Sequence, residues 1–241
     1  MINLLKARLR HGYQAIPNPL TVAIHESFPG LPYIQPDADL EKLNRLCPVK
    51  AFCEKGLDLG KCVFCGICER EEPQMIDFKP NYQIATDARE KLIIALGQEK
   101  LPPIVPINPR LIRRSFALRN VSAAGCNACE LELGASTNVN FDMGRYGIEI
   151  EASPRHTDAL ILTGPISRNM ADALQITWNA IPSPKYLVLC GSCAISGGIF
   201  AQSSELKREF LSRFEAQLFI AGCPAHPLSI IYAIHSFMGA K

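Results

Sequence analysis

The chain has 241 residues, of which 48% are hydrophobic, and this suits one core of moderate size with a smaller appendage, or two small domains. Its 25 basic and 23 acidic side chains give a formal charge of +2, which disfavours nucleic acid as a partner. No signal sequence and no apolar run of about 18 residues is evident, so we expect a cytoplasmic chain, in which ten cysteines favour metal or redox chemistry over disulfides.

The first predicted element is a short basic helix from Met1 to Tyr13. It combines apolar residues with lysine, arginine and histidine and contains no acid, which is typical of an amphipathic surface helix. Such a helix suits a membrane surface or the groove of a partner, and a plain docking helix with a solvated face explains it equally well. Five prolines between Ile16 and Asp37 predict an extended arm that wraps another surface, so residues 1–36 form the first region.

Four cysteines between residues 47 and 68 form the first candidate metal site. Cys62, Cys65 and Cys68 follow one another at three-residue steps, and Cys47 precedes a proline. A triplet of this spacing with a remote Cys-Pro partner is typical of a [4Fe–4S] site. Zinc is the alternative for Cys-x-x-Cys pairs, but the triplet with its remote partner favours iron and sulfur. A module of this size buries little apolar surface. We therefore expect the cluster to supply much of the free energy that folds the module.

This part of the chain resembles bacterial-type two-cluster ferredoxin modules, especially those of complex I and of formate-hydrogenlyase-like hydrogenases. The ligands of a second cluster would occupy the positions of Asp37, Leu40, Leu43 and Glu72. All four are missing together while the other set is complete, so the resemblance implies a small α+β ferredoxin-like domain over residues 37–100 with one cluster. Cys53 fits no ligand position and is interpreted as a small buried thiol.

The segment that follows contains a predicted helix and a proline-rich linker. Residues 84–97 read as a helix. Four prolines then predict a semi-rigid linker over residues 101–114, where we place the domain boundary. The arginines that follow without an intervening acid suit a solvated face or an acidic partner; they are Arg110, Arg113, Arg114 and Arg119.

Residues 115–241 alternate between strand and helix patterns. Strands are predicted at residues 116–121, 147–150, 159–162, 185–189 and 217–220, and helices from residue 131 onward and at 170–180, 204–214 and 227–238. This alternation predicts an α/β domain with a doubly wound, mainly parallel sheet of flavodoxin-like fold. No Gly-x-Gly-x-x-Gly follows the first strand, so a dinucleotide or flavin is not supported.

The second set of cysteines follows the ends of three predicted strands. Cys126 and Cys129 come after the first strand, and Cys193 and Cys223 come after two later ones. In open α/β sheets ligands bind beyond the carboxyl ends of the strands. We therefore expect these four thiolates to converge on one all-sulfur site.

Three motifs in this half carry a family resemblance. They are Gly191-Ser192-Cys193-Ala194-Ile195-Ser196-Gly197-Gly198, Gly222-Cys223-Pro224 and Ser153-Pro154-Arg155-His156-Thr157-Asp158. They resemble the family shared by the 20 kDa subunit of complex I and the small subunit of [NiFe]-hydrogenases. The resemblance implies that Cys126, Cys129, Cys193 and Cys223 hold the proximal [4Fe–4S] cluster and that Cys190 has no family role. The separated cysteine pair followed by Glu130 is closer to the group 4 membrane-bound hydrogenases than to the quinone-reducing members.

Further hypotheses concern residues near the expected crevice. Glu130 is a candidate proton relay toward a partner's active site, with charge compensation in the first turn of its helix as the alternative. The Arg155-His156 pair is expected near the same crevice, where the histidine would couple protonation to reduction, with ordinary loop roles as the alternative. The backbone amides of four glycines are candidate donors to the cluster sulfurs; these are Gly125, Gly191, Gly197 and Gly198.

We therefore predict an electron-transfer subunit with two [4Fe–4S] clusters, peripheral on the cytoplasmic side of the inner membrane within a membrane-bound complex. The resemblance implies three kinds of partner: a hydrogenase-like or complex I 49 kDa-like large subunit with the catalytic centre, membrane-arm subunits, and an upstream electron-transfer subunit or ferredoxin. One alternative is the equivalent subunit of a complex I-like quinone or ferredoxin oxidoreductase without nickel. Another is a zinc-stabilised scaffold with no redox role.

Overall fold

The computed structural model describes residues 2–12, 15–107 and 114–239. Its main sheet has six strands in the order β5-β11-β10-β9-β7-β8. The bounds are β5 Ala85–Thr86, β7 Phe116–Ser122, β8 Ile148–Ile150, β9 Ala159–Thr163, β10 Tyr186–Cys190 and β11 Leu218–Ile220. All neighbours are parallel except β5, which pairs antiparallel with β11. The five parallel strands follow the flavodoxin-like order, and the predicted fold class is confirmed.

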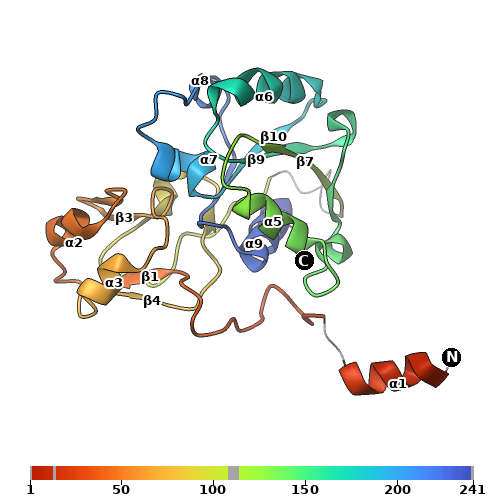
Figure 1. Ribbon diagram of the computed structural model, residues 1–241, viewed down its shortest axis with the longest axis horizontal. Helices are drawn as coiled ribbons and strands as arrows, with labels where there is room; N and C mark the ends of the chain where they lie inside the picture. Colours follow the sequence, from red (N-terminus) through yellow and green to blue (C-terminus); the bar gives the residue numbers. More distant parts are fainter. Residues whose placement is uncertain (1, 13–14, 108–113, 240–241) are drawn as a thin grey trace.

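Helices cover both faces of this sheet (Figure 1). Helix α6 (Arg168–Ala180) and α8 (Glu209–Arg213) lie on one face, and α5 (Ala128–Ser136) and α9 (Pro227–Met238) lie on the other. The side chains of β9 alternate accordingly: Leu160 and Leu162 join the core beneath α6, and Ile161 joins the core beneath α9. The helix predicted at residues 204–214 is limited to α8 at its end.

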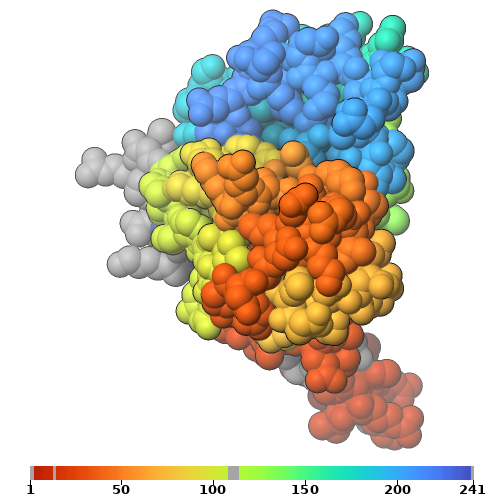
Figure 2. Space-filling model, turned by 90° about the vertical axis from the view of Figure 1, so that its left-hand side faces the viewer, coloured from red at the N-terminus to blue at the C-terminus, as the bar shows by residue number. Residues whose placement is uncertain are grey.

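Residues 32–94 of the amino-terminal half contain two small sheets and two short α-helices. Strand β1 (Pro32–Ile34) pairs with β4 (Ile76–Phe78), and β2 (Phe52–Cys53), β3 (Gly56–Asp58) and β6 (Ile93–Ile94) form the second sheet. The helices are α2 (Leu40–Leu46) and α3 (Ile67–Glu71). Figure 2 shows this half, in orange and yellow, packed against the blue carboxy-terminal segments. Their buried side chains form one continuous core, because Leu57 and Ile94 belong to the same cluster as Leu189 and Phe219.

The helix predicted at residues 84–97 is wrong. This segment contains β5, the 3₁₀ turn η1 (Arg89–Leu92) and β6. Ala85 and Thr86 complete the edge of the main sheet, and Ile93 and Ile94 pair with Asp58 and Leu57. Pairing with distant strands therefore overrode the local helical pattern.

The predicted linker and arm both lie against the sheet domain. Ile104 is buried in the core beneath α9, and the Ile107 amide donates to the Phe237 carbonyl at 3.0 Å. Along the arm, Pro19 is buried, and the Ile16 amide donates to the Asn140 carbonyl at 2.7 Å. The extended arm thus wraps this same chain. Residues 108–113, with Arg110 and Arg113, lie outside the described residues, and the boundary at 101–114 stays a prediction.

The predicted basic helix is α1 (Ile2–His11), and it projects from the rest of the molecule (Figures 1 and 2). Its leucines are exposed to 76% at Leu4, 61% at Leu5 and 84% at Leu9. None of the helices in the described segments is long and apolar enough to span a bilayer.

Candidate iron–sulfur sites

The first four predicted ligands come together beside the small sheet. Cys47 ends α2, Cys62 and Cys65 lie in the loop after β3, and Cys68 lies in the first turn of α3. All four line one small cavity, whose other walls are largely apolar and include Val49, Phe52, Leu57 and Phe78. The structure therefore brings together the set that the sequence predicted.

Backbone amides point at the sulfurs of this set. The Ala51 amide donates to Cys47 Sγ and the Phe64 amide donates to Cys62 Sγ, both at 3.3 Å. Burial raises the pKa of the Cys62 thiol well above its ordinary value, and the neighbouring cysteines add to the shift. Burial likewise raises the pKa of Cys68 to about 11. These thiols are neutral at pH 7 unless a bound cation displaces their protons, which is how metals bind cysteine.

The other four predicted ligands lie at the carboxyl edge of the main sheet. Cys126 and Cys129 flank the start of α5 after β7, Cys193 lies in α7 (Ser192–Ser196) after β10, and Cys223 follows β11. Burial raises the pKa of Cys129 to about 12, and the charges of Glu130, Cys193 and Cys223 act in the same direction. Burial raises the pKa of Cys193 to about 11, and Cys223 and Cys126 contribute to this shift. The thiols are close enough to affect one another's ionisation, as ligands of one site must be.

Glycines let the backbone approach these sulfurs closely. A Cβ atom on Gly191, whose φ is +88°, would lie 2.4 Å from Cys129 Sγ, and one on Gly198 would lie 2.8 Å from Cys193 Sγ. Their amides do not donate to sulfur: Gly191 and Gly197 donate to the carbonyl oxygens of Ile220 and Cys193, and Gly198 donates to Ser196 Oγ. The hypothesis that these three glycines supply hydrogen bonds to the cluster is wrong, because Gly191 pairs with β11 and the other two amides are used within the turn around Cys193. For Gly125 it stays a prediction.

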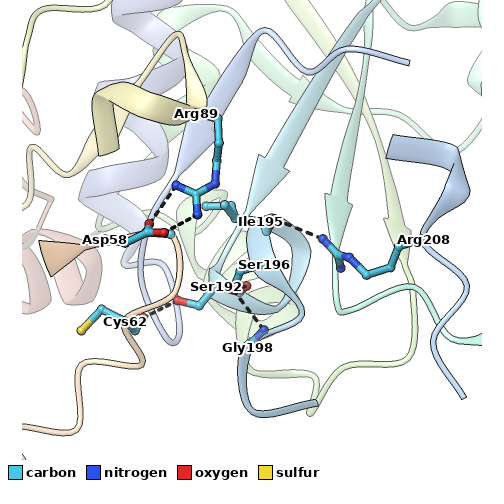
Figure 3. Close-up of polar contacts among 9 residues, drawn as sticks. Asp58, Cys62, Arg89, Ser192, Ile195, Ser196, Gly198 and Arg208 are labelled. Atoms are coloured by element: carbon cyan, nitrogen blue, oxygen red, sulfur yellow. Dashed lines mark hydrogen bonds and ion pairs between the residues drawn. The ribbon is translucent and has the colours of Figure 1, made fainter. Parts of the chain in front are cut away.

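The two sets of cysteines face each other across the interface between the two halves. Ser192, next to Cys193, donates its hydroxyl to the Cys62 carbonyl oxygen at 2.6 Å (Figure 3). Cys65 is among the groups that raise the pKa of Cys223, after burial and Cys126. Phe64 and Cys223 line the same cavity. Beside this contact the Arg89 guanidinium donates two hydrogen bonds, of 2.8 and 2.7 Å, to the Asp58 carboxylate. This pair holds the loop that leads to Cys62 in place.

The structure separates the other candidate residues. Glu130 lies in the first turn of α5 and accepts a hydrogen bond of 2.7 Å from Thr163 Oγ1, at the crevice. Arg155 and His156 lie in the 3₁₀ turn η3 (Pro154–His156), which precedes β9. Their expected place near the crevice is wrong, because the amino end of β9 lies at the opposite edge of a parallel sheet from the cysteine loops.

Two cysteines lie outside both sets. Cys190 is fully buried in the main sheet, whereas Cys53 is exposed. The interpretation of Cys53 as a buried thiol is wrong: successive side chains of β2 point to opposite sides, and Phe52 takes the inward position.

The first set of cysteines has features that an iron–sulfur cluster uses. Within the described ranges, no group of three or more histidine, cysteine, aspartate or glutamate side chains is placed to hold a single metal ion. In a [4Fe–4S] cluster each thiolate binds a different iron, so its ligands stand further apart than those of one ion. Four thiols, apolar walls and amide donors to sulfur are the features that such a cluster uses.

Comparison with known proteins identifies the family. Residues 126–237 match the family model described as the 20 kDa subunit of NADH ubiquinone oxidoreductase. Formate hydrogenlyase subunit 7 of Escherichia coli is 34% identical over 128 residues, 53% of this chain and 50% of the relative. NADH-quinone oxidoreductase subunit 6 of Thermus thermophilus is 35% identical over 111 residues, 46% of this chain and 61% of the relative. An uncharacterized protein of Methanocaldococcus jannaschii is 35% identical over 123 residues, 51% of this chain and 82% of the relative.

Two of these relatives are thus named as subunits of a formate hydrogenlyase and of an NADH-quinone oxidoreductase. The chain belongs to the family of the NADH ubiquinone oxidoreductase 20 kDa subunit, an electron-transfer family. The chain spans only about half to three fifths of the two named relatives above.

Three residues at the sites were not predicted: Phe64, Ser192 and Arg208. Phe64 lies between Cys62 and Cys65, and Ser192 directly precedes Cys193. The sequence therefore showed that both residues lie near predicted ligands, but not which atoms they contact. Arg208 lies in the charged run Lys207-Arg208-Glu209 and gave no signal.

Proposed function

We propose that this chain is the electron-transfer subunit of a membrane-bound, group 4 [NiFe]-hydrogenase-like complex and carries two [4Fe–4S] clusters. Cys47, Cys62, Cys65 and Cys68 hold one cluster, and Cys126, Cys129, Cys193 and Cys223 hold the other. The similarity to formate hydrogenlyase subunit 7 supports the choice of complex. The reaction with hydrogen belongs to a large partner subunit.

One observation carries this proposal: the eight cysteines form two separate sets that meet at one interface. The contact from Ser192 to Cys62 joins the residue before Cys193 to a member of the first set, and Cys65 is among the groups that raise the pKa of Cys223. Two redox centres fixed in adjacent parts of one core pass electrons without a docking step between subunits.

The positions of the missing ferredoxin ligands support a single cluster in the first half. Leu43 is fully buried in the core, and Leu40 packs against it. Glu72 is buried and forms an ion pair of 2.5 Å with Lys42. These side chains stabilise the module where relatives of the ferredoxin type hold a second cluster.

Each [4Fe–4S] cluster, when bound, supplies a site that stores and releases one electron. The chain's own residues hold it, exclude water and set its potential. Hydrogen bonds to sulfur from Ala51 and Phe64, at 3.3 Å each, stabilise the added negative charge. The apolar walls around the first set limit solvent access, which lowers the dielectric constant around the site.

The proposal predicts about eight iron and eight acid-labile sulfide per chain in the complex purified without oxygen, since each of the two clusters contains four of each. Identification of the co-purifying large subunit, and assay of hydrogen evolution, distinguish a hydrogenase from a complex I-like oxidoreductase without nickel. Zinc without iron would instead identify a zinc-stabilised scaffold and end the proposal.

A further inference from the structure

Arg208 is a partly buried cation whose position is not explained by the proposed electron-transfer function. It precedes α8, and its guanidinium reaches back to α7, the helix that carries Cys193 (Figure 3). Nη1 donates to the carbonyl oxygens of Pro165 at 2.8 Å and Cys193 at 3.1 Å. Nη2 donates to those of Ala194 at 2.8 Å and Ile195 at 3.1 Å.

These four bonds fix two pieces of backbone around the second site. Pro165 lies just after β9, next to Gly164, and the Cβ position of Gly125 lies 3.1 Å from the Gly164 Cα atom. The other three carbonyls belong to α7 itself. A planar guanidinium with several donors satisfies such a group of carbonyls in one fixed orientation, whereas a lysine ammonium is a point charge on a flexible stem. The position therefore suits arginine better than lysine, although both carry the positive charge.

Among the residues that the structure describes, no carboxylate forms an ion pair with Arg208. In the described part of the chain, the ion pairs of the sheet domain are Arg168 with Glu205 and Lys207 with Asp172, and neither involves Arg208. A buried charge is unfavourable unless a group of opposite sign compensates it. The group that acts electrostatically on Arg208 is Cys193.

The positive charge of Arg208 lies close to Cys193, because its Nη1 donates to the Cys193 carbonyl oxygen at 3.1 Å. A positive charge at this distance favours an additional electron at the site, because reduction adds one negative charge. A carboxylate has the opposite effect, and Glu130 lies next to Cys129 in the chain.

We propose that Arg208 is a positioning residue of the Cys126–Cys129–Cys193–Cys223 site, and that its guanidinium clamps α7 and raises the reduction potential of the cluster held there. The inference rests on the proposed function, since it requires that cluster. One electron enters the site on reduction and one leaves on oxidation, and no covalent bond changes. The potential is thus set in part by a residue outside the cysteine motifs.

The test is a redox titration of the complex, purified without oxygen and monitored by electron paramagnetic resonance, for wild type, R208Q, R208K and R213Q. We expect R208Q to lower the midpoint potential of this cluster and R208K to keep most of the wild-type value. R213Q removes the same charge from a guanidinium that lies over the Phe214 ring, 5.3 Å from its centroid, and should change neither midpoint. The cluster of the ferredoxin-like module serves as an internal reference in every variant.

The outcomes separate the two proposals. A wild-type complex without iron and acid-labile sulfide overturns the proposed function. Two loaded clusters with the same midpoints in R208Q as in wild type overturn only the role of Arg208, and so does a midpoint in R208K as low as in R208Q. If R208Q does not load, R208K decides alone, because a fall to a clearly lower midpoint with the charge retained contradicts the proposal.

Discussion

Gly191 provides the most direct test of the second site at the level of single residues. An alanine Cβ there would lie 2.4 Å from Cys129 Sγ, and the positive φ of 88° disfavours any side chain. We expect Gly191→Ala to prevent assembly of this site, so that iron and sulfide content falls by about half. The cluster of the ferredoxin-like module should remain.

Gly134 is the matched control. It lies in α5, the helix that follows Cys129, and no atom lies within 4 Å of its added Cβ. Gly134→Ala should leave the iron content unchanged and stabilise the helix by up to about 1 kcal/mol. Full iron content in Gly191→Ala would show that Cys129 is not a ligand.

Ser192 is expected to stabilise the contact between the two cysteine sets. Its hydroxyl donates to the Cys62 carbonyl at 2.6 Å in a buried position. Ser192→Ala leaves that carbonyl without this donor and should lower the free energy of unfolding by about 1–3 kcal/mol. Denaturant unfolding measures the loss.

Hydrogen exchange locates the effect of this substitution. Exchange should rise around residues 62–65 in Ser192→Ala. Ser196→Ala removes a hydroxyl from the same helix that donates to the Ser192 carbonyl at 3.0 Å, and it should leave exchange at residues 62–65 unchanged. Equal protection there in both variants would contradict a linking role for Ser192.

The candidate ligands could be read from the sequence, but their surroundings could not. Cysteine spacing and strand ends indicated which cysteines lie near one another, because both signals are local; their role as cluster ligands stays a prediction. The partners of Ser192 and Arg208 depend on how distant segments pack, and no spacing in the chain encodes those contacts. The prediction that glycine amides donate to the cluster sulfurs failed at Gly191, Gly197 and Gly198 for the same reason. A glycine indicates that the backbone approaches another group closely, but not which atom its amide bonds.

At the level of elements, His226 at the start of α9 should make the stability of the fold depend on pH. Its Nδ1 accepts a hydrogen bond of 3.1 Å from the Leu228 amide, and its ring packs edge-on against Phe28 and Phe141. Burial lowers the pKa of His226 below its ordinary value. Below about pH 6.5 the unfolded chain therefore binds a proton here that the folded chain does not. Stability should fall as the pH decreases from 7.5 to 5.

His226→Asn tests this pH dependence. Asparagine keeps an acceptor at the amino end of the helix but does not titrate, so the free energy of unfolding should depend less on pH than in wild type. A remaining slope is expected from His235, whose pKa is also lowered by burial. An unchanged slope between pH 5 and 7.5 would exclude a contribution from His226.

Prediction of the elements succeeded where a segment is stabilised by its own pattern. Helix α9 has the predicted bounds, and each parallel strand lies within two residues of its expected range at both ends. The prediction for residues 84–97 failed because β5 and β6 pair with two different sheets on either side of the turn η1, and the apolar residues of this segment also suit a helix face. Helix α8 is short because residues 204–208 instead contact α6 and α7: the Ser204 carbonyl accepts from Arg168, and Arg208 donates to the Ala194 carbonyl.

At the level of the whole molecule, the two halves share a core and a sheet. Strand β5 comes from the amino-terminal half but completes the main sheet beside β11. On the face beneath α6, Phe219 and Ile195 join the core of the ferredoxin-like half. A buried core shared by the two halves keeps the two cysteine sets at fixed positions relative to each other, which a flexible linker would not.

Truncation of the chain tests this dependence. A chain of residues 101–241 lacks β5, exposes the backbone edge of β11 and uncovers Phe219, so we expect it to aggregate or to unfold at a markedly lower temperature. Removal of residues 1–12 is the control, because the side chains of α1 from residue 3 onward are exposed. It should change the free energy of unfolding by no more than about 0.5 kcal/mol. Calorimetry of both shortened chains against the full chain decides, and a soluble 101–241 chain that melts like wild type would show that the sheet domain folds independently.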